Sequence, residues 1–442
     1  MIEAKKISLV FISLFCATIG YAQAIWSLTD CIQHAQSNNI QAKRHQITIR
    51  QAAIDKKAAQ FARLPTANAE VNTGLNFGRT IDPTTNSFIN QQVGYNSLNV
   101  QTSAIIYNGG RLLNTVKQSQ LNIAVAKENA AAHQQNLALE ITAAYLDILL
   151  AKEQVQIAER QLTQTQEQLT FIDKRIRAEV IPENERLEVL AQIARNTQTV
   201  TNAQNKLAIS YLALKNYLGV APDSPLEIVT PKTAATPNGV IPYQLANIYE
   251  QAVRTQPSIK ASQLQRESAA LGIPLAKADR LPSIALVAAL RSNYSNVSNF
   301  SDAPFFNQFG NNFGQSVALQ VNIPIYNNHR RQLKLERAEI AIIDAEIATQ
   351  QAEQQLKADI QNALTNAQGA KVALEVALSA LDAAQNSFQN ATKKYQLGVM
   401  NTLDYTNIKA NVDTAELDVV KAKYDYLFRL KIIEFYSGKI EF

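Results

Sequence analysis

The chain contains two copies of one pattern, at residues 25–220 and 243–438. Three tripeptides recur in the same order: Arg63-Leu64-Pro65 as Arg280-Leu281-Pro282, Ile106-Tyr107-Asn108 as Ile325-Tyr326-Asn327, and Tyr217-Leu218-Gly219 as Tyr436-Ser437-Gly438. The shift of about 217 to 219 residues is far longer than the period of a solenoid. The sequence therefore predicts a tandem duplication, and the fold must accommodate two nearly equivalent halves.

Each copy is predicted to run helix, strand, polar loop, strand, very long helix, tight turn and helix. The strands, at 66–77, 97–107, 283–296 and 315–326, alternate apolar and polar side chains. The apolar face includes Val71, Leu75, Val100, Ile284, Leu286, Leu319 and Val321, whereas the other face is mostly Asn, Gln and Ser. A length of about 10 to 12 residues suits a tilted strand that crosses a bilayer, but a half-buried sheet in a soluble domain alternates in the same way.

The first 24 residues have the features of a cleaved secretory signal peptide. Lys5 and Lys6 precede an apolar run that ends in Ala22-Gln23-Ala24, so the mature chain is expected to begin near Ile25. The run is shorter than the roughly 20 residues of a membrane anchor. Phe15 is bulky where a lipidation signal before Cys16 needs a small residue, so Cys16 is expected to leave with the signal peptide.

Export and the polar second face together favour strands that cross a membrane around a water-filled lumen. Four strands cannot close a barrel, and open strand edges are not tolerated in lipid. Several copies must therefore contribute to one barrel. Three copies would supply about twelve strands, an even number within the range of outer-membrane barrels.

The long helices carry a heptad seam in both copies. Apolar and small residues follow a 3-4 spacing from Ile141 to Ile176 and from Ile360 to Tyr395. Many of them are alanine, which allows close approach of helix backbones. A solid, soluble coiled coil has the same seam but does not explain the strands.

The segments between paired strands, 78–96 and 297–313, are rich in turn-forming residues and are expected to be loops outside the cell. The second loop also contains aromatic residues, namely Phe300, Phe305, Phe306, Phe309 and Phe313. They form either an aromatic girdle at the membrane surface or the internal packing of a folded loop.

With these features, the chain resembles the TolC family of outer-membrane efflux proteins. The resemblance rests on the order of its motifs across both copies: the opening helices (Leu28-Thr29-Asp30-Cys31-Ile32 with Asn38-Asn39; Leu245 to Ala252 with Gln256-Pro257), the recurring tripeptides, and the turn from Tyr395 to Asp404. It implies a homotrimer in the outer membrane of a Gram-negative bacterium, with a twelve-stranded β-barrel continuous with a periplasmic α-helical barrel. The implied partners are a periplasmic adaptor (membrane fusion) protein, an inner-membrane transporter and outer-membrane lipid.

The resemblance also implies roles for the two turns between long and short helices, which form the periplasmic tip in the family. The residues matched to adaptor contact are Val180, Ile181, Pro182, Gly398, Val399, Met400 and Asn401. Glu185 and Asp404 match the position of an acidic constriction, although Asn401 with Asp404 and Pro182 with Glu185 also read as helix-capping pairs. Glu179 departs from the family's small turn residue, and Asn407 stands where some members have a second Asp.

The remaining features argue against catalysis and nucleic-acid binding. The histidines His34, His45, His133 and His329 lack metal-ligand spacing, and the chain has neither a phosphate-binding glycine loop nor a nucleophile elbow. The net charge of +5 is dispersed rather than concentrated on one face.

We therefore expect no enzymatic activity, cofactor, metal or nucleic-acid partner. Residues 221–242 read as a proline-rich equatorial linker, and 439–442 as a tail. Two functions remain: the outer-membrane exit duct of a tripartite efflux pump or type I secretion system, or a periplasmic coiled-coil protein with a structural or adhesive role.

Overall fold

A computed structural model describes residues 25–81, 86–230, 244–296 and 304–438. The predicted signal peptide, the tail and the second half of the linker lie outside these residues. The chain divides into two compact units. The sheet unit comprises Gln46–Asn129 and Ser258–Ala352, and the helical unit comprises the chain up to His45, Ala130–Pro257 and the chain from Glu353 onward.

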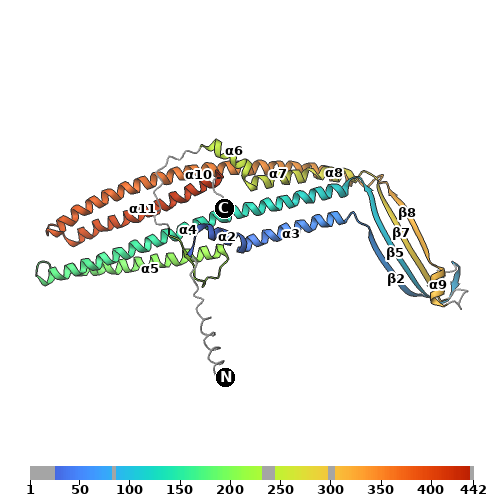
Figure 1. Ribbon diagram of the computed structural model, residues 1–442, viewed down its shortest axis with the longest axis horizontal. Helices are drawn as coiled ribbons and strands as arrows, with labels where there is room; N and C mark the ends of the chain where they lie inside the picture. Colours follow the sequence, from blue (N-terminus) through green and yellow to red (C-terminus); the bar gives the residue numbers. More distant parts are fainter. Residues whose placement is uncertain (1–24, 82–85, 231–243, 297–303, 439–442) are drawn as a thin grey trace, which may run out of the picture. The chain divides into compact units, whose positions relative to one another are not determined.

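The sheet unit contains four antiparallel strands: β2 (Thr66–Asn76), β5 (Val93–Asn108), β7 (Ser283–Ser295) and β8 (Gly314–Asn322). Their order is β2-β5-β7-β8, so the two copies meet at the β5–β7 pair and β2 and β8 are the edges (Figure 1). β2 and β7 begin directly after Pro65 and Pro282, because proline ends the preceding helix and favours extended backbone before it.

Six of the eight strand limits differ from those predicted by alternation, and four of these differ by one residue, among them the ends of β2 at Asn76 and β5 at Asn108 and the start of β8 at Gly314. β5 begins at Val93 rather than 97, and β7 ends at Ser295 rather than 296. β8 ends at Asn322 rather than 326, since Pro324 cannot donate a ladder hydrogen bond. The register also shifts between Ile105 and Tyr107, so the alternation expected through Ile106 is broken by an irregularity.

The predicted loops contain structure of their own. β3 (Arg79–Ile81) pairs with β4 (Phe88–Asn90), and the short helix α9 (Phe305–Asn311) lies against β7. Gln308 accepts a hydrogen bond from the Ser295 amide and donates to the Ser295 carbonyl, and the Phe305 ring lies 5.0 Å from that of Tyr294. These contacts support internal packing of the loop for Phe305; Phe300 lies outside the described residues.

The helical unit is built from paired helices. α4 (Arg111–Arg177) and α10 (Arg330–Gln396) each have 67 residues and enter this unit at Ala130 and Glu353. Each is followed by a 35-residue helix, α5 (Asn184–Leu218) or α11 (Thr402–Tyr436) (Figure 1). The residues of the heptad seams are buried or half-buried, with Ile141, Ile148 and Ile172 fully enclosed on α4 and Ile360 and Ala367 on α10.

The opening helix of each copy is divided, whereas the sequence predicts one helix. In the first copy α2 (Leu28–Asn38) ends at Asn39 and α3 (Ile40–Phe61) follows. The Asn39 side chain accepts from the amides of Gln41 and Ala42 and donates to the Tyr217 carbonyl, so it caps α3 and fixes the break. The second copy has α6 (Leu245–Thr255), α7 (Pro257–Ala270) and α8 (Gly272–Ala278), with one break at Gln256, which precedes Pro257, and another at Leu271.

The described part of the predicted linker contains β6 (Glu227–Ile228), which pairs in parallel with β1 (Ile25–Trp26). The hydroxyl of Tyr145, on α4, donates to the Val229 carbonyl beside this pair. Burial of Cys31 beneath it raises the pKa of the thiol to about 12, so the cysteine is unreactive. None of the helices within residues 25–81, 86–230, 244–296 and 304–438 combines the length and low polarity that a membrane span requires.

Candidate functional site

The strand register places the predicted lipid-facing residues on one face of the sheet. Directly paired residues in an antiparallel sheet project to the same side. The ladder joins Ala69, Val100 and Leu290 in one row, Ala104, Leu286 and Leu319 in another, and Ile284 with Val321 in a third. Val71 pairs with Leu98 and Leu75 with Gly94, at positions that alternate with the polar face. The structure therefore brings all seven predicted residues into one apolar face.

The opposite face is polar over most of its area. Its rows join Asn68 with Gln101 and Ala289, Glu70 with Asn99 and Arg291, and Asn72 with Ser97 and Asn293. Gln320 lies on this face opposite Ala285. A sheet with one apolar and one polar face can separate a hydrocarbon phase from water.

Both tip turns close with the same backbone hydrogen bonds. In the first, the amides of Glu179 and Val180 donate to the carbonyls of Ile176 and Arg175; in the second, those of Gly398 and Val399 donate to Tyr395 and Lys394. This is the Schellman arrangement, which requires left-handed backbone at one residue. That residue is Glu179 in the first turn (φ 56°) and Gly398 in the second (φ 76°).

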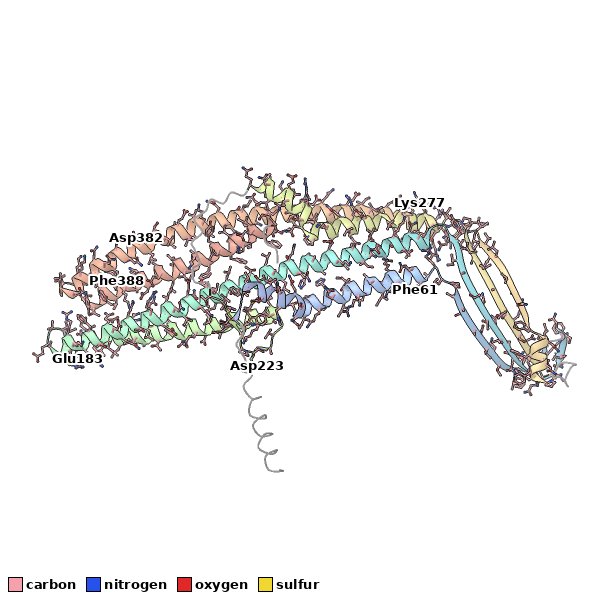
Figure 2. All side chains as sticks on the ribbon, in the orientation of Figure 1. Phe61, Glu183, Asp223, Lys277, Asp382 and Phe388 are labelled. Atoms are coloured by element: carbon pink, nitrogen blue, oxygen red, sulfur yellow. The ribbon has the colours of Figure 1, made fainter. Side chains whose placement is uncertain are left out.

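The tip turns expose apolar side chains. Val180, Leu397 and Val399 are each more than half exposed. Pro182 and Asn401 are exposed too, whereas Ile181 and Met400 are half-buried. Glu183 lies where the first turn enters α5 (Figure 2). Exposed apolar groups at the end of a helix pair are suited to contact with another protein.

The two predicted constriction carboxylates have different surroundings. Asp404 is exposed; its amide donates to Asn401 Oδ1 at 2.7 Å, and its carboxylate accepts from Asn401 Nδ2 at 3.0 Å. Asn401 is thus the N-cap of α11, with the reciprocal bonding of the capping pair considered from the sequence. Glu185 is half-buried in the first turn of α5, whose N-cap residue Glu183 makes no side-chain capping bond.

A buried polar layer joins the two helix pairs, and the sequence reasoning missed it. Thr165 on α4 is 1% exposed and accepts hydrogen bonds from Asn196 Nδ2 at 2.9 Å and from Lys409 Nζ at 3.2 Å. Lys409 comes from α11 and is itself buried. The 4-3 spacing of Thr402, Thr406 and Lys409 is the signal that marks this lysine as an inward position.

Burial shifts the pKa values of the charged groups near this layer. It lowers the pKa of Lys409, an effect opposed by Asp413, and raises the pKa of Asp413, an effect opposed by Lys409. Arg160 and Glu416 form an ion pair at 2.8 Å nearby, again between α4 and α11. The layer therefore couples the helix pair of one copy to that of the other.

Two of the histidines meet in the helical unit although they are distant in sequence. The rings of His45 and His133 stack with centroids 4.6 Å apart, and burial lowers the pKa of His133. Across the described residues no group of three or more His, Cys, Asp or Glu side chains is arranged to hold a metal ion.

Comparison with known proteins identifies the family. The chain is 25% identical over 180 residues to Protein CyaE of Bordetella pertussis (strain Tohama I), an alignment that covers 40% of this chain and 36% of that protein, or about a third of its length. The fold is similar to that of CusC, at 19% identity, 93% and 91% coverage and a TM-score of 0.76. It is also similar to that of a membrane protein from Pseudomonas aeruginosa, at 16% identity and a TM-score of 0.77, over 93% of this chain and 90% of that one. The outer membrane protein VceC from Vibrio cholerae has 15% identity and a TM-score of 0.74, over 93% of this chain and 96% of that one.

The family model described as Outer membrane efflux protein matches residues 32–220 and 248–438, which correspond to the two copies. The solved structures share this chain's fold over nearly its whole length. Because the model covers most of both copies, the chain belongs to the outer membrane efflux protein family.

Proposed function

We propose that the protein is the outer-membrane exit duct of a tripartite efflux pump or type I secretion system. In this proposal, three copies close a twelve-stranded barrel whose lumen continues through a periplasmic helical barrel. The observation that carries the proposal is the four-stranded sheet, with one apolar face and two edges, β2 and β8, that lack partners within the described chain. Open strand edges cannot persist in lipid, so edge pairing between copies accounts for both edges at once.

The family match makes the protein an outer-membrane protein with a periplasmic helical domain. Its family is one of channels rather than enzymes. The energy for transport comes, in our proposal, from an inner-membrane transporter. A periplasmic adaptor links that transporter to the tip, where Val180, Ile181, Pro182, Gly398, Val399, Met400 and Asn401 supply the contact surface. The exposure of Val180 and Val399 supports this part.

Conductance measurements test the duct. Trimers separated from monomers should conduct across planar bilayers, and monomers should not, because one sheet cannot close. A monomer that forms pores by itself contradicts the proposal. Extraction provides a second test: a heat-resistant trimer that leaves the outer membrane only with detergent supports the duct, whereas release without detergent supports the periplasmic coiled-coil alternative.

The carboxylates of Glu185 and Asp404 are proposed to ring a constriction at the tip. Three copies would bring six carboxylates together, so the pore should prefer cations and be blocked by multivalent cations added from the periplasmic side. Glu185→Gln with Asp404→Asn should weaken both properties while keeping the trimer, because an amide oxygen at 404 still accepts from Asn401.

The matched control for this test is Asp418→Asn, which removes an exposed carboxylate from α11 away from its first turn. It should leave ion selectivity unchanged. If the double variant loses thermal stability while selectivity stays the same, the two carboxylates act only in capping, and the constriction assignment is wrong.

A further inference from the structure

A small cavity lies in the sheet unit where the second copy passes from its last strand into α10. Its volume is about 180 Å³, and it is lined by Arg280, Ile325, Tyr326, Asn327, His329, Arg331 and Gln332. Two of these side chains carry guanidinium groups, and none carries a carboxylate. The cavity thus offers several donors and a positive charge, which is the chemistry of an anion site.

Arg331 is the central observation. Its Nε and Nη2 atoms are buried and have no hydrogen-bond partner. A buried donor without a partner is costly, and a charged one more so, which makes such groups rare unless a ligand completes them. Nearby Arg280 Nη2 already donates to Gln332 Oε1 at 2.6 Å, and Gln332 Nε2 donates to Glu336. The unmet donors are therefore those of Arg331.

The first copy shows that the fold does not require this arginine. Leu112 occupies the position equivalent to Arg331, and the preceding turn there is Gly109-Gly110, both at positive φ. The second copy builds the same turn from Asn328 and His329, at φ 52° and 57°, a conformation that side chains rarely adopt. Divergence has thus placed polar side chains in the second copy where the first has glycine and leucine.

The two copies also differ in the acidic partner available to the arginine that begins each long helix. Arg111 of the first copy, at the start of α4, forms an ion pair with Asp279 of the second copy, which also pairs with Lys334 at 2.6 Å. The equivalent of Arg111 is Arg330, and the equivalent of Asp279 is Ala62. The first copy therefore offers no acid at the position that would match Arg330 as Asp279 matches Arg111.

An exposed apolar track leads from the sheet to the cavity. Val317, Leu319 and Val321 lie on the apolar face of β8, and the alternation continues through Ile323 to Ile325. All five are at least half exposed, and Ile325, which also lines the cavity, is 91% exposed. A ligand with both an anionic group and hydrocarbon chains fits this arrangement, whereas free phosphate has no apolar part that could contact the track.

We propose that the cavity binds the phosphate group of an anionic phospholipid in the inner leaflet of the outer membrane, with the lipid's chains along the apolar track. The inference rests on the proposed membrane barrel, because only then does the strand–helix connection lie at the depth of the lipid headgroups. Bound phosphate oxygens would accept hydrogen bonds from Arg331 Nε and Nη2.

Native mass spectrometry of the detergent-solubilised trimer tests the proposal, with phosphatidylglycerol or zwitterionic phosphatidylcholine as the probe. Wild type should retain phosphatidylglycerol, at up to one molecule per chain, in preference to phosphatidylcholine. Arg331→Leu, which installs the residue of the first copy, should weaken phosphatidylglycerol retention about tenfold. Arg337→Leu is the matched control: it removes one exposed positive charge from the same helix outside the cavity lining and should behave as wild type.

Equal retention of the two lipids by wild type, or equal behaviour of the two variants, would overturn the proposal. Should Arg331→Leu not assemble, Arg280→Gln removes the other lining guanidinium and should also weaken the preference. Displacement of the lipid by inorganic phosphate at comparable concentration would assign the cavity to free phosphate instead. Bilayer conductance of the same samples separates the hypotheses, because lost lipid preference with intact trimer conductance refutes only this site.

Discussion

The two copies share a backbone plan but differ in their side chains at equivalent places. In the buried layer of the helical unit, the first copy supplies Thr165 and Asn196, where the second has Ala384 and Ala415. The second copy supplies Lys409, where the first has Leu190. The bond from Asn196 to Thr165 lies within the first copy, and Lys409 extends the layer across to the second copy.

At the tip turns the two copies do not complement each other. Instead, the second copy has residues that are better suited to the backbone conformation that both turns share. Gly398 takes the left-handed position without steric cost, and Asn401 caps α11. The first copy places Glu179 in the same conformation and starts α5 without a side-chain cap. The comparison indicates that the first tip turn is the less stable of the two.

The largest expected effect is on the sheet, where the copies should behave alike. Val100 and Leu319 are equivalent positions on the apolar face, and Gln101 and Gln320 are their neighbours on the polar face. Arginine at Val100 or Leu319 should destabilise the assembled barrel by about 2 to 4 kcal/mol, because a charge is moved into hydrocarbon. The measurement is trimer yield and denaturant-induced unfolding in lipid.

Arginine at Gln101 or Gln320 is the control and should have little effect on assembly, since these side chains lie on the polar face, which the proposed barrel turns toward its lumen. If all four variants tolerate arginine equally, the apolar face does not contact lipid. If only one of the two apolar positions is sensitive, the copies are not equivalent in the barrel.

The next largest loss of stability is expected in the buried polar layer formed by Thr165, Asn196 and Lys409. Thr165→Val keeps the side-chain shape but removes the acceptor for Asn196 and Lys409. Leaving these two donors without that acceptor should destabilise the helical unit by about 2 to 3 kcal/mol. Adding Lys409→Met should recover part of the loss, because the buried charge is gone, and a double-mutant cycle measured by thermal unfolding gives the coupling.

The loss from Thr165→Val should also depend on pH. Burial lowers the pKa of Lys409, so the folded state binds this proton less well than the unfolded state. The charged lysine therefore opposes folding below its folded pKa, and this opposition disappears as pH rises toward the unfolded value. The difference between wild type and Thr165→Val should shrink at alkaline pH. A loss of constant size across pH would mean that Lys409 takes no part in it.

The sequence predicts the long-range plan of the molecule better than its local breaks. Heptad spacing and strand alternation are repeated many times, so the inward-facing seam of α4 and the membership of the apolar sheet face follow from pattern alone. The break at Asn39 depends on one side chain that bonds to Tyr217, far away in the chain, which no local pattern contains. The strand irregularity near Ile106 likewise arises from pairing between the copies.

The candidate sites show the same limit. The tip residues follow from the motif in each turn, but the burial of Lys409 and the unmet donors of Arg331 depend on which helices and strands meet. A lysine or arginine is exposed in most proteins, so residue type alone favours the surface for both. Comparing equivalent positions in the two copies, Leu190 with Lys409 and Leu112 with Arg331, marks these residues as unusual before the structure is seen.

A smaller effect is expected at the cap of the second turn. Asn401→Ala removes the acceptor for the Asp404 amide and should destabilise the start of α11 by about 1 kcal/mol. Hydrogen exchange of the first-turn amides of α11 should increase. The first turn of α5 serves as an internal reference, since it has no side-chain cap to lose and should exchange as in wild type.

The smallest effect separates backbone strain from side-chain contact at the tip, by exchanging the two residues at the left-handed position. Glu179→Gly relieves the strain of a side chain at φ 56° but increases the freedom of the unfolded chain, so a net stabilisation of about 0.5 kcal/mol is expected. Gly398→Glu should reverse both terms and cost about the same. A Cβ at position 398 would meet only Arg175 Nη2, at 3.8 Å, an ordinary contact, so the cost there comes from the backbone.

Thermal unfolding of the helical domain in matched buffers measures both changes. If Glu179→Gly destabilises instead, the Glu179 side chain makes a contact in the assembled trimer that outweighs the strain, and the first turn differs from the second by function rather than by incomplete adaptation.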